Sequence, residues 1–394
     1  MIYLDNSATT KVMPEVLDAM LPYLQEEYGN AGTLYKLGID ANKAVEKARE
    51  QVAKFIGAKR DQIIFTSSGT EANNMVFYGI KKYLESIDKK HICFSSVEHD
   101  SVFRAGMALF GEKTCIKDGF YTHIIKVKSS GEIDLDDLKN VLEKDSNIGL
   151  VSIMFVNNET GVINPVKEIS NICKEYGVLF HTDCVQAAGC VLINVEEIGC
   201  DFATISGHKI GAPKGVGALY IKNKDIMKPM IYGGESQEFG LRGGTQNVPG
   251  IVGIGKACEI YGSSINVNID CTEYNRRFFY EELTDCMTKN GLNDIINVNG
   301  DTFENGCKVL NLHIKNVDAE TLMILLNAKG MCVSAGSACR SHEQLPSRTL
   351  TSMSIDKEEA RNSIRLSFSS DIKIEDLKDG ARLLADSIKQ LSIN

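Results

Sequence analysis

The sequence predicts an α/β protein with a large domain, in which helices flank a mostly parallel sheet, and a smaller C-terminal α/β domain. Helical and strand patterns alternate over residues 40–222, and this order is typical of parallel strands joined by crossover helices. The 394 residues are enough for two or three structural units with a large buried core. New strand patterns begin after a glycine-rich stretch. We therefore expect a large domain over 15–262 and a small domain formed by 1–14 and 263–394.

Several segments carry helical signals. Residues 38–56 place apolar side chains at a helical period and are followed by Gly57, the residue type that most often ends a helix. Pro165 and Gly177 bracket a second helix, in keeping with the preference for Pro at the start and Gly after the end. Further helices are predicted from Gly69 to about residue 84 and near 374–391.

Short apolar runs predict the strands. Each run is bounded by polar or turn residues, as buried strands usually are. The predicted strands are 63–66, 91–95, 123–127, 148–156, 178–183, 202–206 and 216–221 in the large domain, and 309–314 and 364–369 in the small domain. Ligands of such sheets bind at the carboxyl ends of the strands, so the polar residues that follow these runs are candidates for a site.

The composition argues against several classes of protein. The net charge of −9 disfavours general binding to nucleic acid or anionic lipid, which requires a cationic face. No apolar run approaches the roughly 20 residues of a membrane-spanning helix, and the first ten residues lack the pattern of a signal peptide. The twelve cysteines have no zinc-type spacing, so we expect most of them to be reduced and buried in a cytoplasmic protein.

The segment SSGTEANN follows the strand 63–66. Ser68 and Glu71 have the spacing of a capping box, so one interpretation is a well-capped helix with no further role. The other is an anion site, because Gly69 lets the backbone approach a ligand and the N–H groups of a helix start attract phosphate. Thr70 would add a hydroxyl group to such a site.

Lys209 directly follows the strand 202–206, in the segment ISGHKIGAPKG. A lysine in a buried setting loses charge more readily, and its free amine can then form a Schiff base. Ser206 and His208 beside it can donate hydrogen bonds to a phosphate. A surface lysine in a turn is the ordinary alternative.

Three other strand ends carry polar side chains. Asp183 either caps a following helix or pairs with a cationic nitrogen of a ligand, and Gln186 lies one turn further on. His99 is either an interior histidine or a side chain that stacks on a flat ligand and moves protons near neutral pH. Asn158 forms either an Asx turn or a hydrogen bond to a ring hydroxyl.

Residues 334–350 show no periodicity and predict a long loop, a kind of segment that is often functional. This loop contains Cys339 beside Arg340, whose charge favours the nucleophilic thiolate. An inert cysteine is the alternative, but the small polar neighbours argue against it. Arg365, in the next strand, offers a planar fork for a carboxylate or forms an ordinary salt bridge.

Taken in order, these segments resemble the cysteine desulfurases of the NifS/IscS type. The matching motifs are LDNSATT, TSSGTEANN, VEHDSV, VNNETG, HTDCVQAAG, SGHKIGAPKG, RGGTQNVPGIVG and SAGSAC…SIRLSF, and they extend from residue 3 to about 370. The resemblance implies a fold-type I enzyme of the class V aminotransferase group that depends on pyridoxal 5′-phosphate (PLP). The SAGSAC segment is similar to that of the group I subtype, which has the longer nucleophile loop.

The resemblance also implies how PLP is held. Lys209 would bind it as a Schiff base, Asp183 would pair with its ring nitrogen and Gln186 with its ring oxygen. His99 would stack on the ring and transfer protons, and Asn158 would lie nearby. The phosphate ligands would come from the segments already described and from a partner subunit, which makes the protein a homodimer; they are Gly69, Thr70, Ser206, His208 and, from the partner, Thr245.

The implied reaction converts L-cysteine to L-alanine and leaves the sulfur on Cys339 as a persulfide. Arg365 and Asn158 would hold the carboxylate of L-cysteine. An acceptor protein would then take the sulfur for iron–sulfur cluster assembly, tRNA thiolation or DNA phosphorothioation. The alternatives are a selenocysteine lyase or other class V PLP enzyme, and a catalytically weak docking subunit of a sulfur-transfer complex.

The sequence departs from this family pattern at three places. Tyr35 stands where a histidine is common, and Glu235 and Ser236 interrupt the usual glycine-rich GGGQE segment. Gly243 replaces a usual serine. These positions concern the substrate entrance and the dimer contact more than the chemistry.

Overall fold

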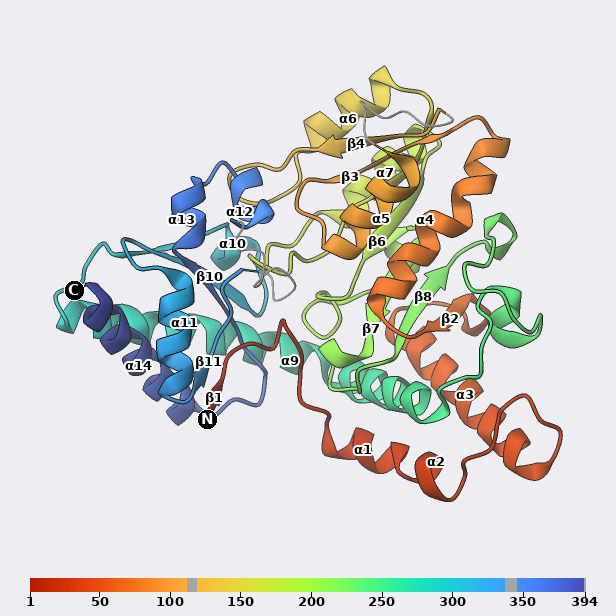
Figure 1. Cartoon of the computed structure of the whole chain (residues 1–394), viewed down its shortest axis with the longest axis horizontal. Helices are drawn as coiled ribbons and strands as arrows, with labels where there is room; N and C mark the ends of the chain where they lie inside the picture. Colours follow the sequence, from red (N-terminus) through yellow and green to blue (C-terminus); the bar gives the residue numbers. More distant parts are fainter. Residues whose placement is uncertain (112–118, 337–345, 393–394) are drawn as a thin grey trace.

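The large sheet has seven strands and occupies the right-hand part of Figure 1. The computed structural model describes residues 1–111, 119–336 and 346–392. The strands lie in the order β2-β8-β7-β6-β5-β3-β4; β7 to β4 run parallel, and β8 is antiparallel to both of its neighbours. Their bounds are β2 (Ile63–Thr66), β3 (His91–Ser95), β4 (Tyr121–Ile125), β5 (Ile148–Ser152), β6 (Leu179–Asp183), β7 (Phe202–Ser206) and β8 (Gly217–Ile221).

Helices cover both faces of this sheet, which confirms the predicted α/β class. One hydrophobic core joins one face to α4 (Gly69–Ser86) and α5 (Asp100–Phe110). A second core joins the other face to α3 (Lys36–Phe55), α6 (Leu135–Lys144) and α7 (Val166–Glu175). Shorter helices complete this part: α1 (Pro14–Met20), α2 (Pro22–Gln25), α8 (Val195–Ile198), and the 3-10 turns η1 (Arg60–Gln62), η2 (Gly207–Lys209), η3 (Lys224–Ile226) and η4 (Gln237–Gly240).

The C-terminal part has its own sheet and core. Three antiparallel strands lie in the order β12-β10-β9, with bounds Ser363–Ser367, Val309–Ile314 and Ile296–Val298. The N-terminal β1 (Ile2–Tyr3) pairs in parallel with β11 (Met331–Cys332), so the first residues of the chain belong to this part. Its helices are α10 (Thr302–Asn305), α11 (Ala319–Ala328), α12 (Arg348–Ser352), α13 (Lys357–Arg361) and α14 (Ile374–Ser392).

A single long helix, α9 (Val248–Lys289), extends along both parts of the molecule (Figure 1). It begins inside the glycine-rich stretch, where the side chain of Asn247 caps it by accepting a hydrogen bond from the Gly250 N–H at 3.2 Å. Its glycines allow other segments to approach closely. A Cβ atom on Gly255 would lie 2.6 Å from Cα of Ala48 in α3, and one on Gly253 would lie 2.8 Å from the sulfur of Met20. The helical backbone of α9 is interrupted at Ser264. This is two residues after 262, the expected end of the large domain, and the domain boundary itself stays a prediction.

Two expected elements differ in extent. The apolar run 148–156 forms a strand only to Ser152, because the remaining residues enter the connection that carries Asn158. The expected loop 334–350 is shorter than predicted: Ser334 pairs with Arg365, and α12 begins at Arg348. Cys339 and Arg340 lie outside the described residues.

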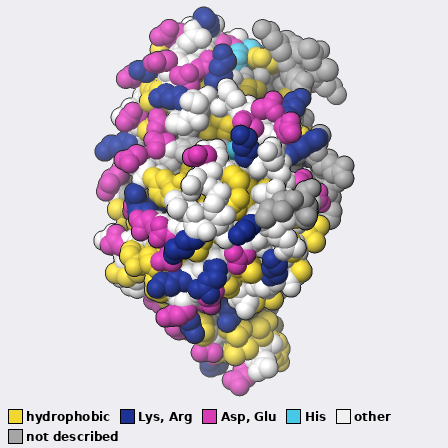
Figure 2. Space-filling model, turned by 90° about the vertical axis from the view of Figure 1, so that its left-hand side faces the viewer, with side chains coloured by type: hydrophobic (Ala, Val, Ile, Leu, Met, Phe, Trp, Pro, Cys, Tyr) yellow, Lys and Arg dark blue, Asp and Glu magenta, His cyan; other side chains and the backbone are white. Residues whose placement is uncertain are grey.

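Charged side chains of both signs are intermixed over the face shown in Figure 2. The chain carries 43 Lys and Arg against 52 Asp and Glu, which gives the net charge of −9. Within the described ranges, no helix combines the length and the apolar character that crossing a bilayer requires.

Candidate active site

A cavity of about 200 Å³ lies at the carboxyl ends of the large-sheet strands, where the N-terminal segment and β12 close it. This is the place where α/β sheets bind ligands. Ten of the residues singled out from the sequence line it: Gly69, Thr70, His99, Asn158, Asp183, Gln186, Ser206, His208, Lys209 and Arg365. Thr245 is exposed and is not part of the lining. No cysteine of the described segments lines the cavity.

The start of α4 forms one wall. Ser68 caps this helix and accepts a hydrogen bond from the backbone N–H of Glu71 at 3.1 Å. Gly69 is required here, because a Cβ atom would lie 2.8 Å from Cγ2 of Val185. The helix therefore presents free backbone N–H groups to the cavity, with the hydroxyl of Thr70 beside them, and this arrangement suits an anion.

The predicted capping box is only half formed. The carboxylate of Glu71 does not return to Ser68; it accepts hydrogen bonds from the backbone of Ser67 at 2.9 Å and from Arg242 at 2.8 Å. Burial alone would raise the pKa of Glu71, but these hydrogen bonds lower it. Glu71 thus fixes the glycine-rich segment against α4, a contact that spacing along the sequence does not reveal.

Asp183 and His99 are joined by a hydrogen-bonded chain through Asn73 and Ser101. The amide nitrogen of Asn73 donates to Oδ2 of Asp183 at 2.7 Å and to Oγ of Ser101 at 2.8 Å. Oγ of Ser101 lies 2.7 Å from Nδ1 of His99, and the Ser101 backbone N–H donates to the same nitrogen at 3.1 Å.

This chain assigns the tautomer of His99. The amide of Asn73 must turn its nitrogen toward the carboxylate of Asp183, since its oxygen would be repelled there. The hydroxyl of Ser101 receives one hydrogen from Asn73, so its own hydrogen points to Nδ1 of His99. The imidazole therefore carries its proton on Nε2.

Lys209 is fixed by the N-terminal segment. Its ammonium group donates hydrogen bonds to the backbone carbonyls of Ser7 and Ala8, the latter at 2.9 Å. Gln186 donates to the same Ser7 carbonyl at 3.0 Å, and the backbone N–H of Ser7 donates to Oγ of Ser367 at 2.8 Å. The motif LDNSATT is thus a wall of the cavity.

His208 is a neutral donor at neutral pH. Burial, followed by the positive charges of Lys209 and Lys214, lowers the pKa of His208 to about 4. Its Nδ1 lies 3.2 Å from the hydroxyl of Thr9. Such an imidazole offers a ring N–H to an anion without carrying a charge of its own.

Arg365 combines both roles considered from the sequence. It is 2% exposed; Nη2 forms an ion pair with Asp5 at 2.8 Å, and Nη1 donates to the carbonyl of Asn158 at 3.0 Å. Its Nε has no hydrogen-bond acceptor among the described residues. The guanidinium group is therefore held in one orientation while it still lines the cavity.

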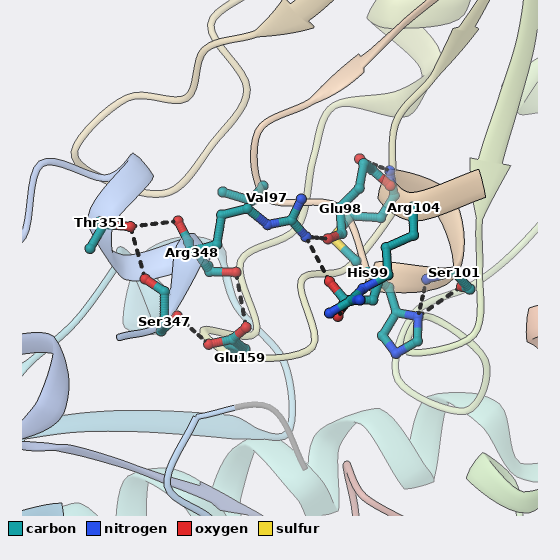
Figure 3. Close-up of polar contacts among 12 residues, drawn as sticks. Val97, Glu98, His99, Ser101, Arg104, Glu159, Ser347, Arg348 and Thr351 are labelled. Atoms are coloured by element: carbon teal, nitrogen blue, oxygen red, sulfur yellow. Dashed lines mark hydrogen bonds and ion pairs between the residues drawn. The ribbon is translucent and has the colours of Figure 1, made fainter. Parts of the chain in front are cut away.

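The last residues of the expected loop 334–350 are attached to segments that adjoin the cavity, as Figure 3 shows. The hydroxyls of Ser347 and Thr349 donate to the carboxylate of Glu159, at 2.5 and 3.1 Å. Arg348 donates to the carbonyl of Glu98 and contacts Oδ1 of Asp100 at 3.4 Å. Because Glu159 follows Asn158 and Glu98 precedes His99, this anchor is tied to both segments.

The described cysteines are poor alternatives to Cys339. Seven of them are buried and three are half-buried. A hydrogen bond with Cys307, and then the charge of Lys308, lower the pKa of the Cys190 thiol below its ordinary value. It is 3% exposed and lies outside the cavity lining, so substrate does not reach it.

Several site residues were missed by reasoning from the sequence: Asp5, Ser7, Asn73, Ser101, Glu159 and Arg348. Five of them, all except Arg348, lie inside motifs that were recognised, but nothing in a motif names the distant partner of each side chain. Arg348 carries no local signal beyond its position next to a functional segment.

Comparisons with known proteins agree with this geometry. The family model for aminotransferase class-V matches residues 2–379. Cysteine desulfurase IscS of Dictyoglomus turgidum is 40% identical over 99% of this chain and 95% of its own length. Cysteine desulfurase IscS of Methanosarcina thermophila is 39% identical over 99% of this chain and 92% of its own length.

Solved structures give the same result. A NifS-like protein superposes with a TM-score of 0.87 and 32% identity, and all of both chains are covered. A structure described as SspA in complex with cysteine gives a TM-score of 0.76 and 29% identity over 94% of this chain and 99% of that one. The chain belongs to the aminotransferase class-V family, in which its curated relatives are cysteine desulfurases.

Proposed function

We propose that this protein is a PLP-dependent cysteine desulfurase that converts L-cysteine to L-alanine and passes the sulfur through Cys339 to an acceptor protein. The observation that carries the proposal is the single cavity that brings Lys209, Asp183, His99 and Arg365 together. Relatives with about 40% identity over nearly the whole chain are cysteine desulfurases, and a neighbouring structure contains cysteine.

The residues of the cavity fit PLP. The start of α4, with Ser206 and the neutral imidazole of His208, suits a phosphate. Asp183 presents a carboxylate that Asn73 and the backbone N–H of Val185 hold in place, as a cationic ring nitrogen requires. Oε1 of Gln186 is buried and has no partner among the described residues, so it is available to the ring oxygen as the acceptor of a hydroxyl hydrogen.

Lys209 would bind the aldehyde carbon of PLP through its amine. When bound, the group supplies an electron sink for bond changes at the substrate α-carbon. We assign proton transfer at that carbon to the amine of Lys209 once it is free. We assign the role of proton donor to His99, through its Nε2. Arg365 and the amide of Asn158 would orient the substrate carboxylate.

The sulfur step balances with a thiolate nucleophile. The sulfur of Cys339 attacks the substrate sulfur, so that an S–S bond forms and the Cβ–S bond of the substrate breaks. The electron pair of that bond stays with the carbon fragment, which takes up protons and leaves as alanine. The transferred sulfur is thereby oxidised to the persulfide level, and the carbon is reduced.

We further propose a homodimer in which Thr245 of each chain serves the cavity of the other. Thr245 is exposed here. Large apolar side chains are exposed between α2 and α3 and near residue 232; they include Tyr28 at 70%, Leu34 at 93% and Tyr232 at 73%. Apolar surface of this kind suits burial against a second copy.

The decisive experiment compares Lys209→Ala and Cys339→Ser with the unmodified protein. We expect Cys339→Ser to keep the visible absorbance of bound PLP but to form alanine from L-cysteine at less than about one-hundredth of the normal rate, without a protein persulfide. Lys209→Ala should lose the covalent PLP linkage. Formation of a keto acid in place of alanine would contradict the proposed function, and normal activity of Cys339→Ser would contradict the assigned nucleophile.

A further inference from the structure

A second group of potential ligand side chains lies at the other end of β3 from the cavity. His91 is the first residue of β3, His123 is the third residue of the edge strand β4, and Asp145 directly follows α6. The candidate active site lies beyond the carboxyl end of β3. Five strand residues at about 3.3 Å each separate the two ends by roughly 13 Å or more. This group therefore plays no part in the chemistry proposed above.

The three side chains converge on one point. Oδ2 of Asp145 lies 2.6 Å from Nδ1 of His91 and 2.7 Å from Nε2 of His123. One ligand atom from each residue lies within 4.8 Å of the other two. All three side chains are about one-fifth exposed, at 20%, 22% and 17%, so solvent and small ions can reach them.

The surroundings hold this arrangement in place. The ring of Tyr121 packs edge-on against His91, with centroids 5.6 Å apart, and against His123 at 4.4 Å. The backbone N–H of Asn147 donates to the second oxygen of Asp145 at 3.0 Å and leaves Oδ2 directed at the two rings. Such supporting contacts are typical of the residues around a metal ligand.

We propose that His91, His123 and Asp145 bind a divalent first-row transition-metal ion, Zn²⁺ in particular, with water in the remaining positions. Two imidazole nitrogens and one carboxylate oxygen are a ligand set for Zn²⁺, Co²⁺ or Ni²⁺, whereas Mg²⁺ and Ca²⁺ require mostly oxygen. Metal–ligand bonds of about 2.0–2.2 Å in a tetrahedral arrangement place the ligand atoms roughly 3.4 Å apart. The carboxylate of Asp145 needs to move by less than about 1 Å to reach this spacing, and the two ring nitrogens, which lie within 4.8 Å of each other, need to approach by at most about 1.4 Å.

The only protonation change that metal binding requires is a change of tautomer in each imidazole ring. In the hydrogen-bonded cluster, the nitrogen that faces Oδ2 carries the proton. In the metal-bound form that nitrogen offers its lone pair, and the proton lies on the other ring nitrogen. No electrons are transferred, and Asp145 stays ionised throughout. The ion would join β4, β3 and the end of α6. Its most distant ligands in the sequence, His91 and Asp145, are 54 residues apart.

The test measures Zn²⁺ binding to the full-length protein by equilibrium dialysis, for the unmodified protein and for Asp145→Asn. Any Zn²⁺ taken up by the twelve cysteines contributes equally, because both proteins contain all of them, so the difference in binding reports on this site. We expect the unmodified protein to hold one more Zn²⁺ per chain, or to bind one equivalent at least tenfold more tightly. A Co²⁺ titration should show the corresponding visible bands without a thiolate charge-transfer band.

Two further variants make the result decisive. His123→Gln should reproduce the loss, and it replaces Asp145→Asn if that protein fails to fold. His313→Gln, on β10 in the small sheet, should retain the extra ion. Alanine formation from L-cysteine should be unchanged in all three variants, since none of these residues lines the cavity. Equal Zn²⁺ binding by the unmodified protein, Asp145→Asn and His123→Gln would overturn the proposal and leave the proposed desulfurase function untouched.

Discussion

The two sides of the cavity differ in how their residues are brought into place. On one side, Asp183 ends a strand of the large sheet, and Lys209 and His99 follow the ends of two others, so the sheet itself sets their positions. The other side consists of Asp5, Ser7 and Arg365, which meet only because the two ends of the chain fold together. The difference indicates that the first side depends on local structure, whereas the second depends on contacts between residues that lie 360 positions apart in the sequence.

Among the substitutions that test this difference between the two sides, loss of Arg365 should change the kinetics most. We expect Arg365→Ala to raise the KM for L-cysteine about ten- to hundredfold while PLP stays bound, because a charge-assisted hydrogen bond contributes roughly 1.5–3 kcal/mol. Arg365→Lys keeps the charge but not the planar fork, so its KM should lie between the two. Steady-state kinetics with absorbance of bound PLP would measure both.

The matched control is Arg361→Ala, an exposed arginine on α13. Its KM should equal that of the unmodified protein. If Arg365→Ala also left KM unchanged, Arg365 would serve only as the partner of Asp5.

On the strand-end side, the bridge through Asn73 should matter more than its continuation through Ser101. Asn73→Ala removes a hydrogen bond to an ionised carboxylate, so we expect PLP to bind about tenfold more weakly. Ser101→Ala removes the hydroxyl but leaves the backbone N–H to His99, and its effect should be about threefold. Titration of the apoprotein with PLP, followed by absorbance, gives both values.

Asn74→Ala is the control for this pair, because the side chain of Asn74 donates only to backbone carbonyls, at 2.9 Å to Thr70 and 3.4 Å to Ser101. Its affinity for PLP should be close to normal. An effect of Ser101→Ala larger than that of Asn73→Ala would show that His99, rather than Asp183, is the group the bridge supports.

Arg348 is attached to Glu98 and Asp100, on either side of His99, and its loss should separate PLP binding from turnover. We expect Arg348→Ala to lower kcat about three- to tenfold with PLP affinity unchanged, since it removes hydrogen bonds of about 0.5–1.5 kcal/mol. Arg104→Ala removes a neighbouring, mostly exposed arginine that pairs with the same Asp100, and should have little effect. A parallel loss of PLP from Arg348→Ala would place its role in folding of the cavity instead.

The last effect concerns the dependence of stability on pH, and catalysis plays no part in it. Burial raises the pKa of Glu98 from 4.5 to about 8. Between these values the unfolded chain has lost the proton that the folded chain keeps, so stability falls as pH rises, by up to about 1.4 kcal/mol per pH unit. Glu98→Gln keeps a neutral side chain at all pH values and should remove this part of the decline.

Urea unfolding near pH 5.5 and near pH 8.5 would measure the difference. The gain in stability of Glu98→Gln over the unmodified protein should be larger at the higher pH. Glu168→Gln, an exposed position on α7, should change neither value. An identical pH dependence for the unmodified protein and Glu98→Gln would show that Glu98 is ionised in the folded state.

The sequence predicted the strand-end side well because that side follows from local rules. An apolar run forms a buried strand, and the polar residue after it must lie at the edge of the sheet; this places Asp183 and Lys209 without knowledge of any distant contact. The pairing of Arg365 with Asp5 and the bridge through Asn73 depend on tertiary structure. The close packing of Gly255 in α9 against Ala48 in α3 depends on tertiary structure in the same way.

The position of the N-terminal segment also has a consequence for synthesis of the chain. Asp5 and Ser7 leave the ribosome among the first residues, yet their partners Arg365 and Ser367 are made last. At 5–20 residues per second, the N-terminus waits about 20–70 s before the cavity can close. The strand-end half is complete long before that. In a nascent chain the carbonyls of Ser7 and Ala8 that fix Lys209 are therefore not yet held in place by Ser367. PLP capture during translation would then precede substrate recognition.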